Sequence, residues 1–280
     1  MNAPKAPLKY SCLRSKVPST IHSSVVAIEN SKVLHPALYP DLAQMGGLSP
    51  ALQRVFDELS ADLSLEKVEG VVSPGWAFIR EGSRHSEVVT ALNERNFNID
   101  FWCQGVLYGS GWTSDLREVA RAAVAFHLEK ASVTEIATRF VWLKLNQQVA
   151  SHERGAAFFV TKRWQDLERR LALEQPSHLD ELLPLVIEAA KRPELRRLLP
   201  FTSLNRLCFS RTTGYPYSYD CPLAWPVKGR LFRITAADEQ TVLGEGDAAR
   251  AADLLAANLP QNCGSAIHGT AEDLKGPSRA

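Results

Sequence analysis

The stretch FNIDFWCQGVLYGSGWTSD at residues 97–115 decides the fold, because it runs from strand-like sequence through a glycine turn toward an alanine-rich helix at 116–128. The stretch GRLFRITAADEQTVLGEGD at residues 229–247 follows the same order and leads into another alanine-rich helix at 248–259. Residue identity between the two stretches is low, so the repetition concerns architecture rather than sequence. The chain therefore predicts two modules of one kind.

Apolar residues occupy every second position from Phe97 to Cys103, with Asn98 and Asp100 between them. This alternation predicts a half-buried antiparallel strand over 97–108. The helix that follows begins after Asp115, which we expect to act as its N-cap together with Glu118 three residues later. The polar positions of the strand should face water.

The elements around this strand complete an α-β-β-β-α order. Helical spacing predicts a first helix over 49–61, and strands over 75–80 and 87–92 follow it. In the second half we expect helices over 161–173, 178–191 and 247–259 and strands near 204–210, 223–227 and 231–236.

The predicted fold class is α+β, with two pseudo-repeated α-β-β-β-α modules whose small antiparallel sheets have three strands each and which are joined by a helical segment. The expected organisation is a disordered basic tail over 1–37, a first module over 38–147, a helical connector over 148–176, a second module over 177–262 and a flexible tail over 263–280.

The amino-terminal region of 37 residues is rich in Ser, Pro and Lys and has no acidic residue before Glu29. This composition is typical of a loose basic tail, and an organelle transit peptide is the alternative. No apolar run approaches the length of a membrane span, so we expect a cytoplasmic protein that does not bind membranes.

Charge and cysteine content exclude several function classes. The 32 basic and 31 acidic residues of the 280 leave a net charge of +1, which gives no bulk field for nucleic acid. The five cysteines are odd in number and form no C-x-x-C pair, so we expect a reducing compartment and no structural metal.

Glycine-rich turns precede both alanine-rich helices, a position where phosphate groups sometimes bind. Asp115 and Asp247 follow these turns and would repel a phosphate, so the turns are interpreted as helix caps and no cofactor is predicted. Cys208 and His127 are expected to be buried core residues, and His268 is expected to be solvated in a tail.

The densest group of chemically useful side chains lies in the second module. Guanidinium groups bind carboxylates and phosphates bidentately, and phenols donate hydrogen bonds, so such a group predicts a ligand site. The alternative is a proline-punctuated loop whose tyrosines pack against the sheet. The candidate ligand-binding residues are Arg206, Arg211, Tyr217, Tyr219, Asp220 and Arg233.

Four segments resemble a family of uncharacterised bacterial proteins that are commonly labelled natural product biosynthesis proteins. They are Leu38–Asp41 with Leu52, the GWTSDL core within Gly109–Ala123, Pro193–Ser203, and Leu243-Gly244 with Leu259-Pro260. The resemblance extends over about residues 38–265 and implies a role in secondary metabolism. It supplies no catalytic residues.

Two functions are compatible with the sequence. In the first, the chain is an accessory or enzymatic protein of natural product biosynthesis that binds a polar small molecule or peptide in a groove between its two modules. In the second, it is a non-catalytic interaction module, such as an immunity-like or scaffold protein, whose exposed aromatic residues bind a partner protein.

Overall fold

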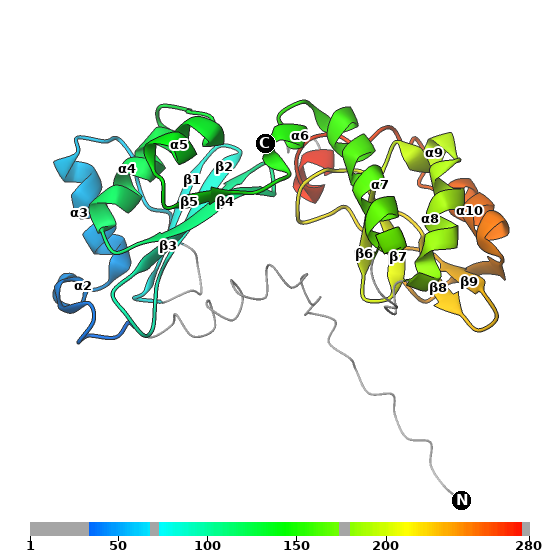
Figure 1. Ribbon diagram of the computed structural model, residues 1–280, viewed down its shortest axis with the longest axis horizontal. Coiled ribbons are helices and arrows are strands. Elements are labelled where there is room, and N and C mark those ends of the chain that lie inside the picture. The colour runs from blue at the N-terminus through cyan, green and yellow to red at the C-terminus, as the bar shows by residue number, and fades with distance from the viewer. Residues whose placement is uncertain (1–33, 68–72, 174–179, 276–280) are drawn as a thin grey trace, which may run out of the picture.

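The computed structural model describes residues 34–67, 73–173 and 180–275, and its chain forms two α+β modules that lie side by side (Figure 1). Each module contains one five-stranded antiparallel sheet. The predicted α+β class with two modules is confirmed, although each sheet has five strands instead of three. Most of the predicted basic tail lies outside the described residues.

The first sheet has its strands in chain order, β1-β2-β3-β4-β5. The elements of this module are α2 (Pro40–Met45), α3 (Leu48–Glu58), β1 (Trp76–Glu81), β2 (Arg84–Thr90), β3 (Phe97–Cys103), β4 (Val106–Thr113), α4 (Leu116–His127), α5 (Val133–Arg139) and β5 (Leu143–Leu145).

The strand predicted over 97–108 is a hairpin, in which β3 turns into β4 at Gln104 and Gly105. Both turn residues have positive φ, at 50° and 74°. Paired left-handed residues are typical of the tight turn that joins two antiparallel strands. The alternation was correct for β3 alone, and the prediction of one long strand was wrong because the turn residues interrupt it.

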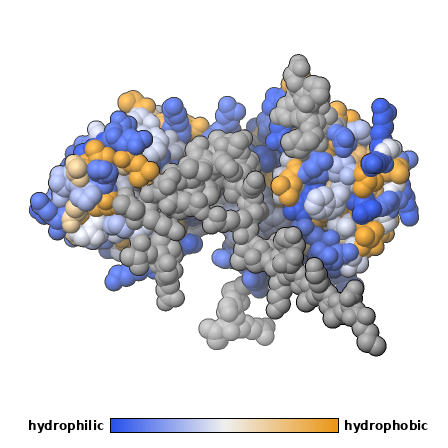
Figure 2. All heavy atoms as spheres, turned by 90° about the horizontal axis from the view of Figure 1, so that it is seen from below, coloured by the Kyte–Doolittle hydropathy of each residue, from blue (hydrophilic) through white to orange (hydrophobic). Residues whose placement is uncertain are grey.

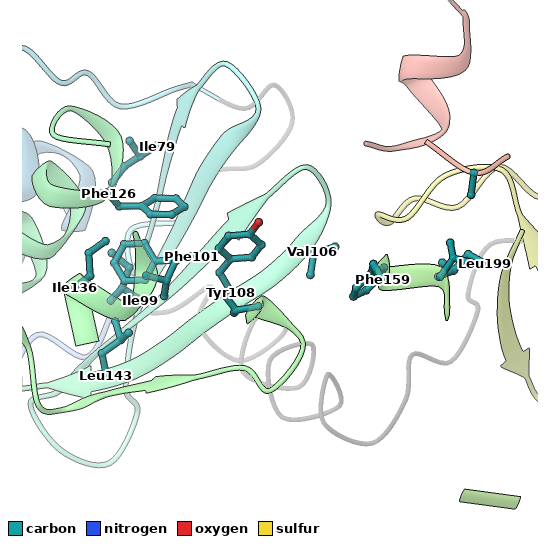
Figure 3. Packing of buried hydrophobic residues seen from close by; sticks show 14 of the residues in the cluster. Ile79, Ile99, Phe101, Val106, Tyr108, Phe126, Ile136, Leu143, Phe159 and Leu199 are labelled. Atoms are coloured by element: carbon teal, nitrogen blue, oxygen red, sulfur yellow. The ribbon is translucent and has the colours of Figure 1, made fainter. Parts of the chain in front are cut away.

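The inner face of the first sheet packs against α3 and α4. Phe97, Ile99 and Phe101 are fully buried there, and the rings of Phe101 and Phe126 lie 4.9 Å apart (Figure 3). The Asp115 side chain accepts a hydrogen bond from the backbone of Arg117 and so caps α4 as predicted. Glu118 bonds Arg121 instead of completing a capping box.

The second sheet has the order β10-β9-β8-β7-β6. Its module consists of α6 (Val149–His152), α7 (Ala156–Leu173), η1 (Asp180–Leu182), α8 (Leu183–Ala190), α9 (Pro193–Arg196), β6 (Leu199–Ser203), β7 (Arg206–Ser210), β8 (Leu223–Val227), β9 (Leu231–Thr235), β10 (Val242–Gly246), α10 (Ala248–Ala257) and η2 (Ala271–Lys275).

The two strands of the second sheet that the sequence did not predict, β6 and β10, are the edges of that sheet. Proline and glycine are unfavourable inside a sheet but are tolerated at edges. Pro200 lies within β6, and β10 contains Gly244 and Gly246 with a register shift between Val242 and Gly244. Because proline and glycine have a low strand propensity, the sequence pattern did not predict either strand.

Two segments outside the predicted modules pack on the second sheet. Helix α7, which falls in the predicted connector, packs along β6 and α8, and Trp164 donates a hydrogen bond to the Leu198 carbonyl. Residues 263–275, expected to form a flexible tail, bond to the segment after β7, where Thr213 N donates to Ile267 O.

Helices cover one face of each sheet and leave the other face free of described helices (Figure 1). We call these the outer faces. On the part of the surface that is coloured in Figure 2, hydrophilic and hydrophobic residues are interspersed on both modules. Within the described residues, no helix has the length and apolarity needed to cross a membrane.

Candidate functional site

The predicted ligand residues Arg206 and Arg233 lie on β7 and β9 and point to the outer face of the second sheet. Arg206 Nη1 lies 2.6 Å from a Glu239 carboxylate oxygen, as an ion pair without the angle of a hydrogen bond, and its guanidinium covers the Trp225 ring at 4.8 Å. Arg233 Nε donates to Glu245 at 2.6 Å. Both cations are therefore engaged by acids of the same module.

The remaining predicted residues come from the loop between β7 and β8. Arg211 donates to Asp220 at 2.9 Å. The rings of Tyr217 and Tyr219 pack against Phe201, with centroids 4.5 and 5.6 Å away. Burial raises the pKa of both phenols, that of Tyr219 to about 12. None of the six predicted residues lines the pocket described next, and their role in ligand binding stays a prediction.

A pocket of about 310 Å³ lies between the two modules. Its walls come from the β1–β2 and β3–β4 turns of the first module and from two segments of the second module. The lining residues are Arg80, Gly82, Ser83, His85, Gln104, Gly105, Tyr215, Pro216, His268, Gly269, Thr270, Glu272 and Asp273. We call this cavity the inter-module pocket.

Backbone hydrogen bonds hold the walls of the inter-module pocket together. Tyr215 N donates to Gly105 O at 2.9 Å, and Gly214 N donates to Gly269 O at 2.7 Å. A Cβ atom on Gly105 would lie 2.7 Å from the Tyr215 nitrogen, closer than real contacts allow, and Gly105 has a φ of +74°. Glycine at this position lets the two modules approach backbone to backbone.

A chain of hydrogen-bonded side chains leads from the pocket into the module junction. His268 Nδ1 lies 3.1 Å from His152 Nε2, and His152 Nδ1 lies 2.8 Å from the Tyr108 hydroxyl. His152 Nε2 is also 3.3 Å from the Thr213 hydroxyl. Tyr108 belongs to β4 and His268 to the end of the second module, so this series of hydrogen bonds crosses the junction between the modules. Figure 3 shows Tyr108 at the end of the first sheet that faces Phe159.

His152 and His268, the two histidines of this hydrogen-bonded series, are neutral at pH 7. Burial lowers the pKa of His152 to about 4, with a smaller contribution from His268, and burial also lowers the pKa of His268. Burial raises the pKa of Tyr108, which stays a phenol. A neutral imidazole has one donor and one acceptor nitrogen, so bonding at His268 Nδ1 fixes which role its Nε2 offers to the pocket.

The charges around the pocket are unevenly balanced. Arg80 donates to Glu66 at 2.9 Å, and burial lowers the pKa of His85 to about 4, so His85 carries no charge at pH 7. Asp273 accepts a hydrogen bond from Thr270 N, whereas Glu272 has no basic side chain within ion-pair distance among the described residues. The lining therefore has a small acidic excess.

Sequence reasoning missed most of this pocket. His268 was expected to be solvated, but it lies in the pocket wall and bonds His152, which is 116 positions away in the chain. His127 is buried as expected, and its Nε2 lies 2.9 Å from the Ser86 hydroxyl. In the described part of the chain, no group of three or more His, Cys, Asp or Glu side chains could hold a metal ion.

In the comparison with known proteins, one family model matches part of the chain, and it names no activity. Residues 158–270 match the model of a family of unknown function, DUF6193. The match covers less than half of the chain and includes Thr213, Tyr215 and His268, but it does not reach the first module. It supports an uncharacterised family and carries no information on natural product biosynthesis. Searches of the curated proteins and of the solved structures found no significant match.

Proposed function

We propose that this protein binds a small polar molecule in the inter-module pocket. The observation that carries the proposal is the hydrogen-bonded chain from Tyr108 through His152 to His268, which places a neutral histidine with a fixed role in the pocket wall. Clefts between modules are favoured places for ligands, and a few oriented polar groups usually decide what binds there.

The size and charge of the pocket limit the ligand. A volume of about 310 Å³ is at the lower end for ligand pockets, which favours a metabolite over a long peptide. The carboxylates of Glu272 and Asp273 favour a ligand with hydrogen-bond donors or an amino group. Tyr215, half exposed at the pocket wall, offers a ring for packing.

The context we propose is secondary metabolism in bacteria, as the resemblance to natural product biosynthesis proteins implies. Within that context the protein acts as an accessory or enzymatic component. Where the free nitrogen of His268 is the acceptor of the neutral imidazole, it can take a proton from a bound molecule, and this is the form that catalysis would take here.

Native mass spectrometry of the protein from its own host tests this proposal. Ser83 is exposed in the pocket wall, so Ser83→Trp should fill the cavity without entering the core. The matched control is Ala237→Trp in the exposed turn between β9 and β10. We expect a small molecule bound to the wild type and to the control and a loss of at least about tenfold in occupancy with Ser83→Trp.

A wild-type protein that carries no small molecule, or equal occupancy in the two tryptophan variants, would refute the proposal. A stoichiometric protein partner without a small ligand would favour the interaction module. One observation supports that second candidate: Arg206, Arg233 and Trp225 lie on the outer face of the second sheet and do not line the inter-module pocket.

A further inference from the structure

Buried residues of the junction determine which hydrogen His268 presents to the inter-module pocket. Tyr108, His152 and Thr213 are 5%, 0% and 2% exposed, and they form one hydrogen-bonded series with His268. The ring of Phe159 packs edge-on against His152 at 5.0 Å and adds no polar atom. The hydrogen bonds of the His152 ring can therefore be followed one by one.

The series begins at the phenol of Tyr108, whose oxygen lies 2.8 Å from His152 Nδ1. Because the lone pairs of a phenol oxygen are delocalised into the ring, the O–H group donates more readily than the oxygen accepts. The Cys103 thiol also lies beside this hydroxyl, but sulfur is a weak acceptor. The phenol therefore donates to His152, and His152 Nδ1 is the acceptor.

The other nitrogen of His152 must then carry the hydrogen. Burial lowers the pKa of His152 to about 4, and a neutral imidazole whose Nδ1 accepts has its hydrogen on Nε2. This Nε2 lies 3.1 Å from His268 Nδ1 and 3.3 Å from the Thr213 hydroxyl. Two N–H groups cannot face each other at such a distance, so His268 Nδ1 carries no hydrogen, whichever of the two neighbours accepts the stronger bond.

The hydrogen of His268 is therefore on Nε2, since burial lowers the pKa of His268 and keeps the ring neutral at pH 7. Among the described residues, none bonds this Nε2, and the atom is not buried by them. Because His268 lines the pocket, a bound molecule must place a hydrogen-bond acceptor against it. The carboxylates of Glu272 and Asp273 line the same pocket and need donors instead.

The charged and titratable groups of the opposite wall do not change this requirement. Arg80 donates through Nε to Glu66, whose charge offsets its own, and burial lowers the pKa of His85 to about 4, so that His85 is neutral at pH 7. Glu272 and Asp273 therefore decide the net charge of the lining. A ligand whose only ionised group is an ammonium group fits this lining better than a zwitterion does.

We infer, as an extension of the proposed function, that the inter-module pocket selects a small amine with an uncharged acceptor, such as an amino alcohol, and that Tyr108 is the positioning residue for this preference. The ammonium group lies at Glu272 and Asp273, and the hydroxyl oxygen accepts from His268 Nε2. Proton abstraction by His268 needs the reverse arrangement of hydrogens, which the phenol of Tyr108 disfavours. An accessory role is thus favoured over general-base catalysis by His268.

NMR spectroscopy of the ring nitrogens in the full chain at pH 7 measures the arrangement of hydrogens directly. We expect the hydrogen on Nε2 of both His152 and His268 in the wild type, and a mixture of tautomers at both rings in Tyr108→Phe. Phe159→Leu is the matched control, because it removes packing at His152 but no hydrogen bond, and it should keep the wild-type tautomers. A wild-type His268 with its hydrogen on Nδ1 would overturn the inference.

Calorimetric titration with phenylalaninol, phenethylamine and phenylalanine tests the selectivity. All three carry a phenyl ring and an ammonium group, but phenethylamine lacks the acceptor and phenylalanine adds a negative charge. We expect phenylalaninol to bind at least about fivefold more tightly than the other two. Tyr108→Phe should reduce this preference to less than about twofold, whereas Phe159→Leu should retain it.

Two results of the titration would contradict the inference. Equal binding of the three ligands by the wild type would overturn the selectivity but leave the pocket as a binding site. Absence of binding by all three would overturn the ligand class, and native mass spectrometry then shows whether the proposed function fails with it: an occupied pocket in the wild type retains that function, and an empty one refutes both.

Discussion

The outer faces of the two sheets share an architecture and differ in charge balance. Each belongs to a five-stranded antiparallel sheet whose helices lie on the opposite face. On the second sheet, every predicted cation has an acidic partner: Arg206 has Glu239 and Arg233 has Glu245. On the first sheet, Glu87 and Asp100 lie side by side without a cation from the described chain.

A dense group of charged residues is a poor guide to a site when its members satisfy one another. The arginines of the second sheet attract attention in the sequence, yet intramolecular partners occupy them. The acids of the first sheet are inconspicuous in the sequence, and no cation of the described residues lies within ion-pair distance of them, although Ser110 donates a hydrogen bond to Asp100. Groups whose pKa is perturbed by burial and by a like charge are better candidates for function.

The largest expected effect is a loss of stability below neutral pH. It comes from buried neutral histidines, which lie in the first module and at the junction. Burial lowers the pKa of His127 to about 3 and the pKa values of His85 and His152 to about 4, against 6.5 in the unfolded chain. Below pH 6.5 the unfolded chain binds protons that the folded chain does not, so the free energy of unfolding decreases as the pH is lowered. We expect a loss of roughly 4 kcal/mol between pH 6.5 and 5.

Urea unfolding at several pH values measures this loss. His127→Gln should reduce the slope of the free energy of unfolding against pH by an amount that corresponds to the uptake of about one proton on unfolding. The raised pKa of Glu87 acts in the opposite direction, since its penalty disappears as the pH falls through about 6 toward 4.5. A free energy of unfolding that stays constant from pH 6.5 to 5 in the wild type would contradict the neutral burial of these histidines.

The second effect tests how closely the two modules must approach. Gly105→Val places a branched side chain against the backbone of Tyr215 at a φ of +74°, so we expect it to lower the free energy of unfolding by about 3 kcal/mol. Gly82→Ala is the control: its φ is +60°, but no atom lies within 4 Å, and it should cost only about 1 kcal/mol. Equal losses would show that the close approach at the junction is unimportant.

A smaller effect compares two tyrosines. Tyr108→Phe removes the partner of His152 Nδ1 inside the junction and should cost about 2 kcal/mol, because a buried polar atom is left unpaired. Tyr219→Phe removes a hydroxyl from a side chain that is 44% exposed and should change stability by less than about 0.5 kcal/mol. Thermal or chemical unfolding of the two variants under one condition measures both values, and a neutral Tyr108→Phe would refute the importance of the chain to His152.

The sequence predicted the fold to the extent that local patterns determine it. Alternation identified the inner face of β3, and an acidic N-cap located the start of α4. The edge strands β6 and β10 were missed because Pro200 and the glycines of β10 are compatible with an edge but not with a typical strand pattern. Gly105 was a usable signal of the β3–β4 turn, since glycine in a strand pattern often marks an interruption.

The sites were predicted less well because their residues meet only through tertiary structure. His152 and His268 are separated by 116 positions, and no spacing rule joins them. The pairing of Glu87 with Asp100 could have been derived, because it follows from the register of the β2–β3 hairpin. The burial of Asp100 could not, since alternation predicts that polar positions face water and nothing local reveals what surrounds them.

The difference between the two outer faces is tested most directly by the unfolding free energies of Glu87→Gln and Glu239→Gln at pH 8. Glu87→Gln removes an unsatisfied charge, so it should stabilise the protein by about 1 kcal/mol. Glu239→Gln removes the partner of Arg206 and should destabilise it by about 1 kcal/mol or less. Effects of opposite sign are predicted; a Glu87→Gln variant that is destabilised like Glu239→Gln would contradict the account.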